Sequence, residues 1–121
     1  MRRITPEQYD VNNAAAAAGT MVVRTLTAAE ITAGKKVYVV GMGIFSSGTC
    51  TVTLKSDAVP TSSPTTLLGP FNLTAQTGIV FPKMSDVEDG FYWTKTVAGR
   101  SLTLVWSAEI QVSGSIVFYV A

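Results

Sequence analysis

Apolar and polar residues alternate most regularly in the last part of the chain, residues 100–121. Ser101–Trp106 shows the period-two pattern of a strand with one buried face. After a break at Ser107–Glu109, Ile110–Val120 predicts a second strand, in which Gly114 indicates a bulge or a tight packing point. Two long strands at this position predict the middle of a β-sandwich. The side chains that we expect to be structural there are Leu102, Leu104, Trp106, Ile116 and Phe118.

Shorter segments upstream carry a similar pattern and are predicted as strands: Thr20–Thr27, Lys35–Phe45, Thr49–Ser56, Thr66–Leu73, Ile79–Pro82 and Phe91–Thr96. In the third of these segments the apolar positions are expected to face inward, namely Cys50, Val52 and Leu54. The threonines beside them are expected to face solvent or a partner, namely Thr49, Thr51 and Thr53.

Glycine and proline mark irregular places in two of these strands. In Lys35–Phe45, Gly41 and Gly43 indicate a bulge or a close backbone contact. Alternation places Val37, Val39 and Gly41 on one side, and Tyr38, Val40 and Met42 on the other. Gly69–Pro70 interrupts Thr66–Leu73 and predicts an edge strand or a bend.

The intervening segments carry turn residues. Ala28–Gly34 predicts a turn with one helical turn around Glu30, and Ser46–Gly48 predicts a hairpin turn. Asp57–Thr65 predicts a loop over one end of the sandwich, and Lys83–Gly90 an acidic loop. About eight antiparallel strands with turns every 8–12 residues predict an all-β sandwich. A jelly roll fits this pattern best, and an immunoglobulin-like sandwich is the alternative.

The first 19 residues lack this periodicity, and we predict an N-terminal arm over residues 1–19 and one sandwich domain over residues 20–121. Ala14–Ala18 predicts a short helix, with Asn12 or Asn13 as N-cap and Gly19 beyond its end, or an extended segment. Such an arm either lies in a groove of a neighbouring subunit or is a disordered tail.

Composition narrows the class of protein. The 121 residues are 47% hydrophobic and 14% charged, against roughly 25% charged in typical domains. This uncharged polar composition suits β-rich surfaces that contact other protein. The net charge of +1 gives no global field favouring nucleic acid or an anionic membrane. A single cysteine excludes an intrachain disulfide, and no apolar run reaches the length of a membrane span. With no secretory signal pattern, we expect a soluble protein made in the cytosol.

The sequence offers little catalytic chemistry, and we predict a protein that is not an enzyme, with no catalytic, cofactor-binding or metal-binding residues. Histidine is absent, so the commonest general base and metal ligand is missing, and no G-x-S-x-G motif occurs. Cys50 is expected to be a small buried hydrophobe. The Gly41–Gly43 segment lacks the third glycine and the following helix of a dinucleotide site.

Three weaker candidate sites stay open. The acidic group Asp86, Glu88 and Asp89 is either a calcium loop or a solvated turn. Asp57 and Glu109 are conceivable as a carboxylate pair for glycoside hydrolysis, although nothing in the sequence pairs them. The aromatic residues form either a core and a protein interface or a stacking platform for sugar or single-stranded nucleic acid, and they are Phe91, Tyr92, Trp93, Trp106, Phe118 and Tyr119.

One ordered series of residues resembles a recurrent pattern in small proteins of tailed bacteriophages. A segment "G-x-[FIY]-x-L-x-A-x-x-G-I" is followed there by an aromatic residue and Lys or Arg, and then by "T-x-x-G-x-x-L-x-L-x-x-S-x-x-x-x-V-x-G-x-[IV]-x-Y". The resemblance covers residues 67–119, less than half of the chain. The matching positions are Gly69, Phe71, Leu73, Ala75, Gly78, Ile79, Trp93, Lys95, Thr96, Gly99, Leu102, Leu104, Ser107, Val112, Gly114, Ile116 and, more loosely, Phe118 or Tyr119.

This resemblance implies a virion structural protein of the capsid decoration, or cement, type. Such a protein binds the major capsid protein on the outer surface of the head as a homotrimer, and the arm of residues 1–19 would reach across neighbouring subunits. The resemblance brings no catalytic residues, no nucleic-acid partner and no membrane partner. A tail, collar or head-fibre subunit of the same fold is the first alternative. The second is a lectin-like module that binds glycans, weakly, through Tyr92, Trp93 or the acidic loop.

Overall fold

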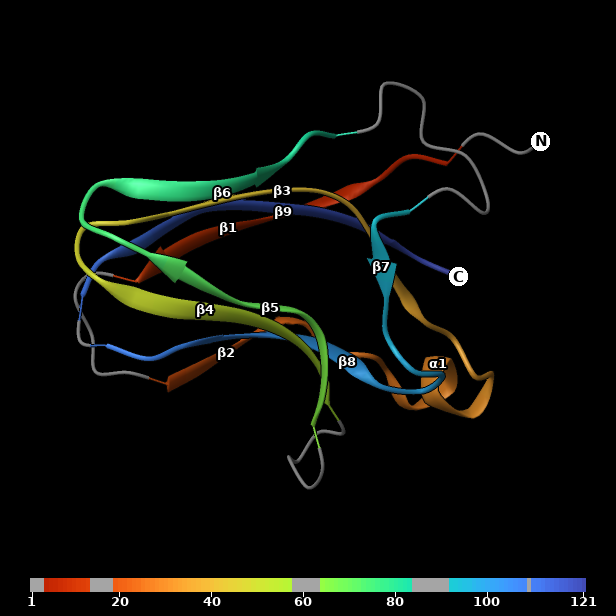
Figure 1. Cartoon of the computed structure of the whole chain (residues 1–121). Helices are drawn as coiled ribbons and strands as arrows, with labels where there is room; N and C mark the ends of the chain where they lie inside the picture. The colour runs from red at the N-terminus through yellow and green to blue at the C-terminus, as the bar shows by residue number, and fades with distance from the viewer. Residues whose placement is uncertain (1–3, 14–18, 58–63, 84–91, 109) are drawn as a thin grey trace.

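The computed structural model describes residues 4–13, 19–57, 64–83, 92–108 and 110–121, and they form two antiparallel sheets packed face to face (Figure 1). The first sheet contains, in spatial order, β1 (Glu7–Asn13), β9 (Val112–Val120), β3 (Val37–Ser46) and β6 (Thr77–Phe81), with β7 (Thr94–Lys95) also paired to β3. The second contains β2 (Gly19–Arg24), β8 (Ser101–Trp106), β4 (Cys50–Asp57) and β5 (Thr65–Leu73). One short helix, α1 (Ala28–Thr32), follows β2.

The strands pair in a nested order that identifies the fold. β1 pairs with β9, β2 with β8, β3 with β6, and β4 with β5, as in a long hairpin folded upon itself. The hairpin then rolls, so that β3 also pairs with β9 and β4 with β8. This arrangement is a jelly roll. The predicted all-β sandwich is therefore confirmed, and its topology is not that of an immunoglobulin domain.

The core lies between the two sheets and is built from the inward positions that alternation predicts. Each of the five residues expected to be structural on β8 and β9 is at most 6% exposed: Leu102, Leu104, Trp106, Ile116 and Phe118. The three inward positions of β4 are also buried: Cys50, Val52 and Leu54. These residues belong to a single apolar cluster.

One face assignment on β3 is wrong, because a bulge changes the alternation. The pairing of β3 with β9 shifts between Val39 and Gly41, so one extra residue enters β3 there. Met42 consequently packs in the main core beside Val39 rather than on the opposite side. Val40 is buried on the other side of the sheet, in a small cluster with Tyr119. The bulge itself agrees with the expectation drawn from Gly41 and Gly43.

Gly114 is the tight packing point that the sequence indicates. Its φ of +139° is a conformation that side-chain-bearing residues rarely adopt. A Cβ atom at this position would lie 1.8 Å from the carbonyl oxygen of Gly43 on the neighbouring strand β3. Only a glycine therefore allows β9 and β3 to approach so closely.

The N-terminal segment differs from the expected arm. Residues 7–13 are extended, but they form β1 at the edge of the first sheet, hydrogen-bonded to β9. Val11 is 2% exposed and belongs to the main core. The apolar pattern of the segment is too weak to stabilise a strand alone. Hydrogen bonding to the edge of β9 provides this stabilisation. The helix considered for Ala14–Ala18 lies outside the described residues.

The hairpin turn predicted at Ser46–Gly48 is wrong, because β3 and β4 lie in different sheets and this turn carries the chain from one sheet to the other. Other expectations hold in outline. The helical turn around Glu30 is α1, and β5 is an edge strand with an irregular register around Gly69–Pro70. The aromatic strand is shorter than predicted, because only Thr94–Lys95 pairs with β3 as β7. Residues 58–63 of the first predicted loop and 84–90 of the acidic loop lie outside the described part of the chain.

Candidate interaction surfaces

The outer face of the first sheet carries a flat area without charged side chains, which we call the glycine–serine face. Its members are the outward positions of three adjacent strands: Gly43 and Phe45 of β3, Gly78 and Val80 of β6, and Ser113 and Ser115 of β9. Their orientation follows from their inward neighbours Ile44, Ile79 and Val112, which pack in the core. Small side chains make this part of the sheet flat.

Two apolar side chains stand exposed on the glycine–serine face. Phe45 is 48% exposed and Val80 is 56% exposed. The Phe45 ring lies across its cross-strand partner Gly78, where an added Cβ would come within 2.3 Å of the ring. Gly78 therefore lets the ring lie flat on the sheet. Exposed apolar side chains surrounded by small neutral residues are typical of a protein-binding surface.

The other end of the same outer face is covered by aromatic residues of the chain itself. The rings of Tyr38 and Tyr119 stack with centroids 4.8 Å apart, and Tyr92 meets Tyr38 edge-on at 5.2 Å. Val40 is buried beneath them. This aromatic cover leaves the glycine–serine face as the open part of the outer surface.

The predicted aromatic platform is thus divided among separate places. Trp106 and Phe118 are in the core, and Tyr92 belongs to the aromatic cover. Trp93 is 44% exposed, but its ring packs 5.4 Å from Phe81 and its Nε1–H donates a hydrogen bond to the Pro82 carbonyl at 2.9 Å. Phe91 lies outside the described residues.

The threonines of the second sheet point outward as predicted but are less accessible than expected. Thr53 alternates with the core residues Val52 and Leu54, yet it is only 8% exposed. Thr103 on the neighbouring strand is 2% exposed, and its hydroxyl donates to the Lys55 carbonyl at 3.3 Å. Both strands lie in the middle of the sheet, where adjacent side chains cover small ones. Thr51, nearer the end of β4, is half-buried.

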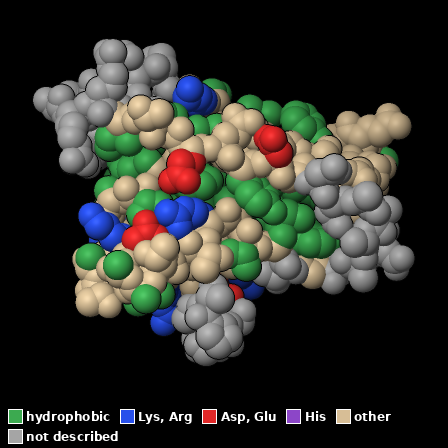
Figure 2. Space-filling view, turned by 180° about the vertical axis from the view of Figure 1, so that it is seen from behind, with side chains coloured by type: hydrophobic (Ala, Val, Ile, Leu, Met, Phe, Trp, Pro, Cys, Tyr) green, Lys and Arg blue, Asp and Glu red, His purple; other side chains and the backbone are tan. Residues whose placement is uncertain are grey.

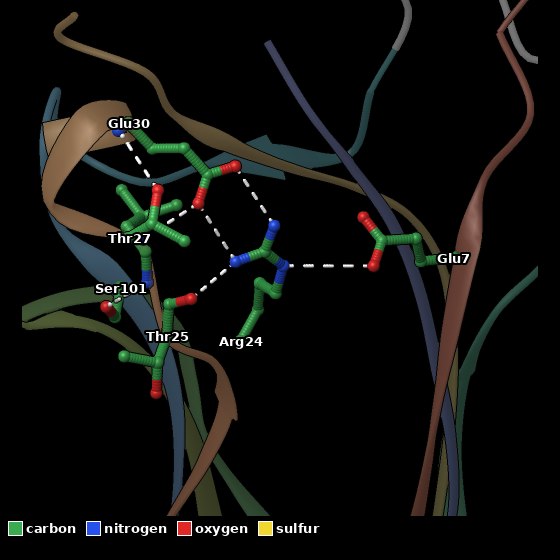
Figure 3. A network of polar contacts seen from close by, with 7 residues as sticks. Glu7, Arg24, Thr25, Thr27, Glu30 and Ser101 are labelled. Carbon is green, nitrogen blue, oxygen red and sulfur yellow. Dashed lines mark hydrogen bonds and ion pairs between the residues drawn. The ribbon is translucent and has the colours of Figure 1, made fainter.

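A polar network joins four elements, β1, β2, α1 and β8, at the α1 end of the sandwich (Figure 3). The Arg24 guanidinium donates to both carboxylate oxygens of Glu30, at 3.1 and 3.0 Å, and also to the Thr25 carbonyl. Glu7 of β1 lies 3.8 Å from the same guanidinium. Ser101 of β8 accepts a hydrogen bond from the Leu26 amide at 3.1 Å. The network fixes the chain between β2 and α1.

Glu30 also caps the helix that carries it. The Thr27 amide donates to the Glu30 carboxylate at 2.8 Å, and the Glu30 amide donates to the Thr27 hydroxyl at 3.2 Å, which completes a capping box. The bond from the Thr27 amide, followed by the bond from Arg24, lowers the pKa of the Glu30 carboxyl below its ordinary value. The Glu30 carboxylate therefore takes up its proton at a lower pH than an ordinary glutamate does.

The space-filling view from behind supports an interaction surface rather than a cleft (Figure 2). Hydrophobic side chains form a continuous area in the centre of this view, and acidic and basic side chains lie beside it on the left and above. Between β1 and β2, the half-buried side chains of Tyr9 and Met21 meet, with the hydroxyl 3.8 Å from the sulfur. The described residues enclose no pocket.

The candidate chemical sites gain no support from the residues that the structure places. Cys50 is buried, as expected, and burial raises the pKa of its thiol. Gly41 and Gly43 lie within strand β3 and precede no helix. Asp57 is 2% exposed on β4, whereas Glu109 and the acidic group Asp86, Glu88 and Asp89 lie outside the described residues.

Two observations concern the described part of the chain only. Within it, no three His, Cys, Asp or Glu side chains gather where they could hold a metal ion. None of the helices found there has the length and apolar character needed to cross a membrane.

On the glycine–serine face, the exposed pair Phe45 and Val80 is the part that sequence reasoning missed. Both residues lie in predicted strands, but their outward direction depends on the bulge in β3 and on the pairing of β3 with β6.

Comparison with protein-family models, with curated proteins and with solved structures found no match, so the functional argument rests on the residues of the chain itself.

Proposed function

We propose that this chain is a virion structural protein, a decoration protein that binds the outer surface of a phage head as a trimer and stabilises the shell. The observation that carries the proposal is the glycine–serine face, with Phe45 and Val80 exposed on it. The ordered motif over residues 67–119 supplies the phage context, and three members of this face or its packing belong to that motif, namely Gly78, Ile79 and Gly114.

The physical argument concerns what such a face binds. The centre of a protein–protein interface is depleted of charged residues and built around a few apolar anchors. A flat sheet face with two apolar anchors therefore suits another flat protein surface, such as a shell or a second subunit. Jelly rolls are a common architecture of viral capsid proteins, which agrees with this assignment by analogy of fold.

The proposal is tested by locating the protein in purified particles and measuring its copy number against that of the shell subunit. A decoration protein is expected in a number comparable to the shell subunit, and the purified protein is expected to bind particles that lack it. A copy number that is a small fraction of the shell subunit assigns it to a tail or collar and refutes decoration. Absence from particles, combined with saturable quenching of tryptophan fluorescence by a sugar, would favour the lectin-like alternative.

A further inference from the structure

A second exposed apolar area lies at the α1 end of the sandwich, and we call it the α1 patch: Ile31, Lys35, Lys36 and Val97. Ile31 and Val97 are each 47% exposed. The Gly99 amide donates to the Lys35 carbonyl at 2.7 Å, and a Cβ at Gly99 would lie 3.6 Å from the Ile31 side chain. The turn after β7 and the end of α1 therefore form one continuous surface.

The α1 patch is basic. Neither Lys35 nor Lys36 forms an ion pair within the described part of the chain. The nearest carboxylate in sequence, Glu30, is bound by Arg24 through two hydrogen bonds. Asp57 is buried on β4 and presents no charge at the surface. An occupant of the patch must therefore combine negative charge with an apolar side chain.

The chain itself contains a segment of this chemistry. Residues 84–90, with the sequence MSDVEDG, carry three of the eight acidic residues of the protein together with Met84 and Val87. Among the described acidic residues, Glu7 and Glu30 both lie against Arg24. The segment therefore holds three of the six acidic residues that do not lie against Arg24, and it is the only place in the sequence where three of them occur within four residues.

We infer that the α1 patch of one copy binds the acidic segment, residues 84–90, of a second copy. The contact is heterologous, because it joins two different surfaces, and such contacts close into rings when the rotation between subunits allows. Opposite charges steer and orient the association, while Ile31 and Val97 supply the apolar centre. The inference deepens the trimer of the proposed function and rests on it for the number of subunits.

The test is a charge swap, with the molar mass in solution measured by light scattering and sedimentation. One variant reverses the patch (Lys35→Glu with Lys36→Glu), and another reverses the segment (Asp86→Lys with Glu88→Lys). Each variant alone is expected to associate about 10-fold more weakly or worse, because like charges then face each other. A chain with both reversals is expected to recover the association. Lys55→Glu, the same charge change away from the patch, is the matched control.

Mixing separates a contact between copies from one within a chain. The two singly reversed variants present complementary charges to each other, so a mixture is expected to form mixed dimers although neither variant associates alone. A ring of three cannot alternate two variants, so the closed trimer is expected only from the chain with both reversals. Ile31→Ser tests the apolar centre without changing charge and is expected to weaken association about 10-fold. Thermal unfolding of each variant shows whether the sandwich is intact, and Ile31→Ser gives a second test if a reversed variant does not fold.

The outcomes distinguish this inference from the proposed function. Wild-type protein that stays monomeric at all concentrations refutes both the contact and the trimer. A trimer that all the variants preserve refutes only the contact at the α1 patch. If the variants change the thermal stability but leave the molar mass unchanged, and mixing restores nothing, the acidic segment contacts its own chain. This outcome also overturns the inference.

Discussion

At the scale of single residues, comparing Gly114 with Gly34 distinguishes two reasons for requiring glycine, close packing and backbone conformation. Both have positive φ, +139° and +67°, but only Gly114 faces neighbouring backbone, whereas Gly34 has no atom within 4 Å of an added Cβ. Gly114→Ala is expected to lower the free energy of unfolding by more than about 3 kcal/mol, and Gly34→Ala by about 1–2 kcal/mol. Urea denaturation of the two variants measures the difference. Equal losses would show that close packing of β9 on β3 is not what requires glycine.

Residue patterns predicted most of the core, because alternation is local information. The inward faces of β4, β8 and β9 follow directly from it, and Cys50 is buried as its neighbours suggest. The error at Met42 has a specific cause, whereas Val40 lies on the side predicted for it. One extra residue in β3 inverts every later position, and only the pairing with β9 shows which residue is the extra one.

At the scale of elements, α1 depends on an ionised side chain, which makes its contribution depend on pH. Because the folded-state pKa of Glu30 is below its ordinary 4.5, its stabilising effect is complete above pH 4.5 and is lost as pH falls through the lower folded value. Glu30→Gln keeps an acceptor for the cap but removes the charge. It is expected to cost less than about 1 kcal/mol at pH 7.

The check is the difference in free energy of unfolding between wild type and Glu30→Gln across acid pH. The difference is expected to shrink below pH 4.5. Glu7→Gln, which removes a single 3.8 Å contact to the same Arg24, is the control and should change stability less. A difference that grows as the pH falls would contradict the lowered pKa.

Strand β1 shows why one element escaped prediction from sequence. The segment EQYDVNN offers only Tyr9 and Val11 as apolar inward positions, which is too short a pattern to distinguish from a polar arm. Its strand conformation comes from long-range pairing with β9. By contrast, α1 carries its own signal, since Thr27 and Glu30 form a capping box within the local sequence.

At the scale of the whole molecule, the nested order of pairing places distant segments on one surface. The glycine–serine face brings together β3, β6 and β9, and no local pattern indicates that Phe45 and Val80 lie on adjacent strands. Turn spacing predicted a sandwich, but the partner of each strand depends on how the sheets roll. The candidate surface was therefore less predictable than the core.

A charge placed on the glycine–serine face tests whether the whole molecule binds through it. Val80→Arg is the change, and Val22→Arg on the second sheet is the matched control, because Val80 is 56% and Val22 is 40% exposed. Each should change the free energy of unfolding by no more than about 0.5 kcal/mol, since both side chains stand at the surface. Binding to particles that lack the protein, measured by co-sedimentation, is expected to weaken about 10-fold or more for Val80→Arg only, because an interface centre tolerates an unpaired charge poorly. Equal binding by both variants would exclude this face as the attachment surface, and equal loss by both would mean that attachment does not discriminate between the two sheets.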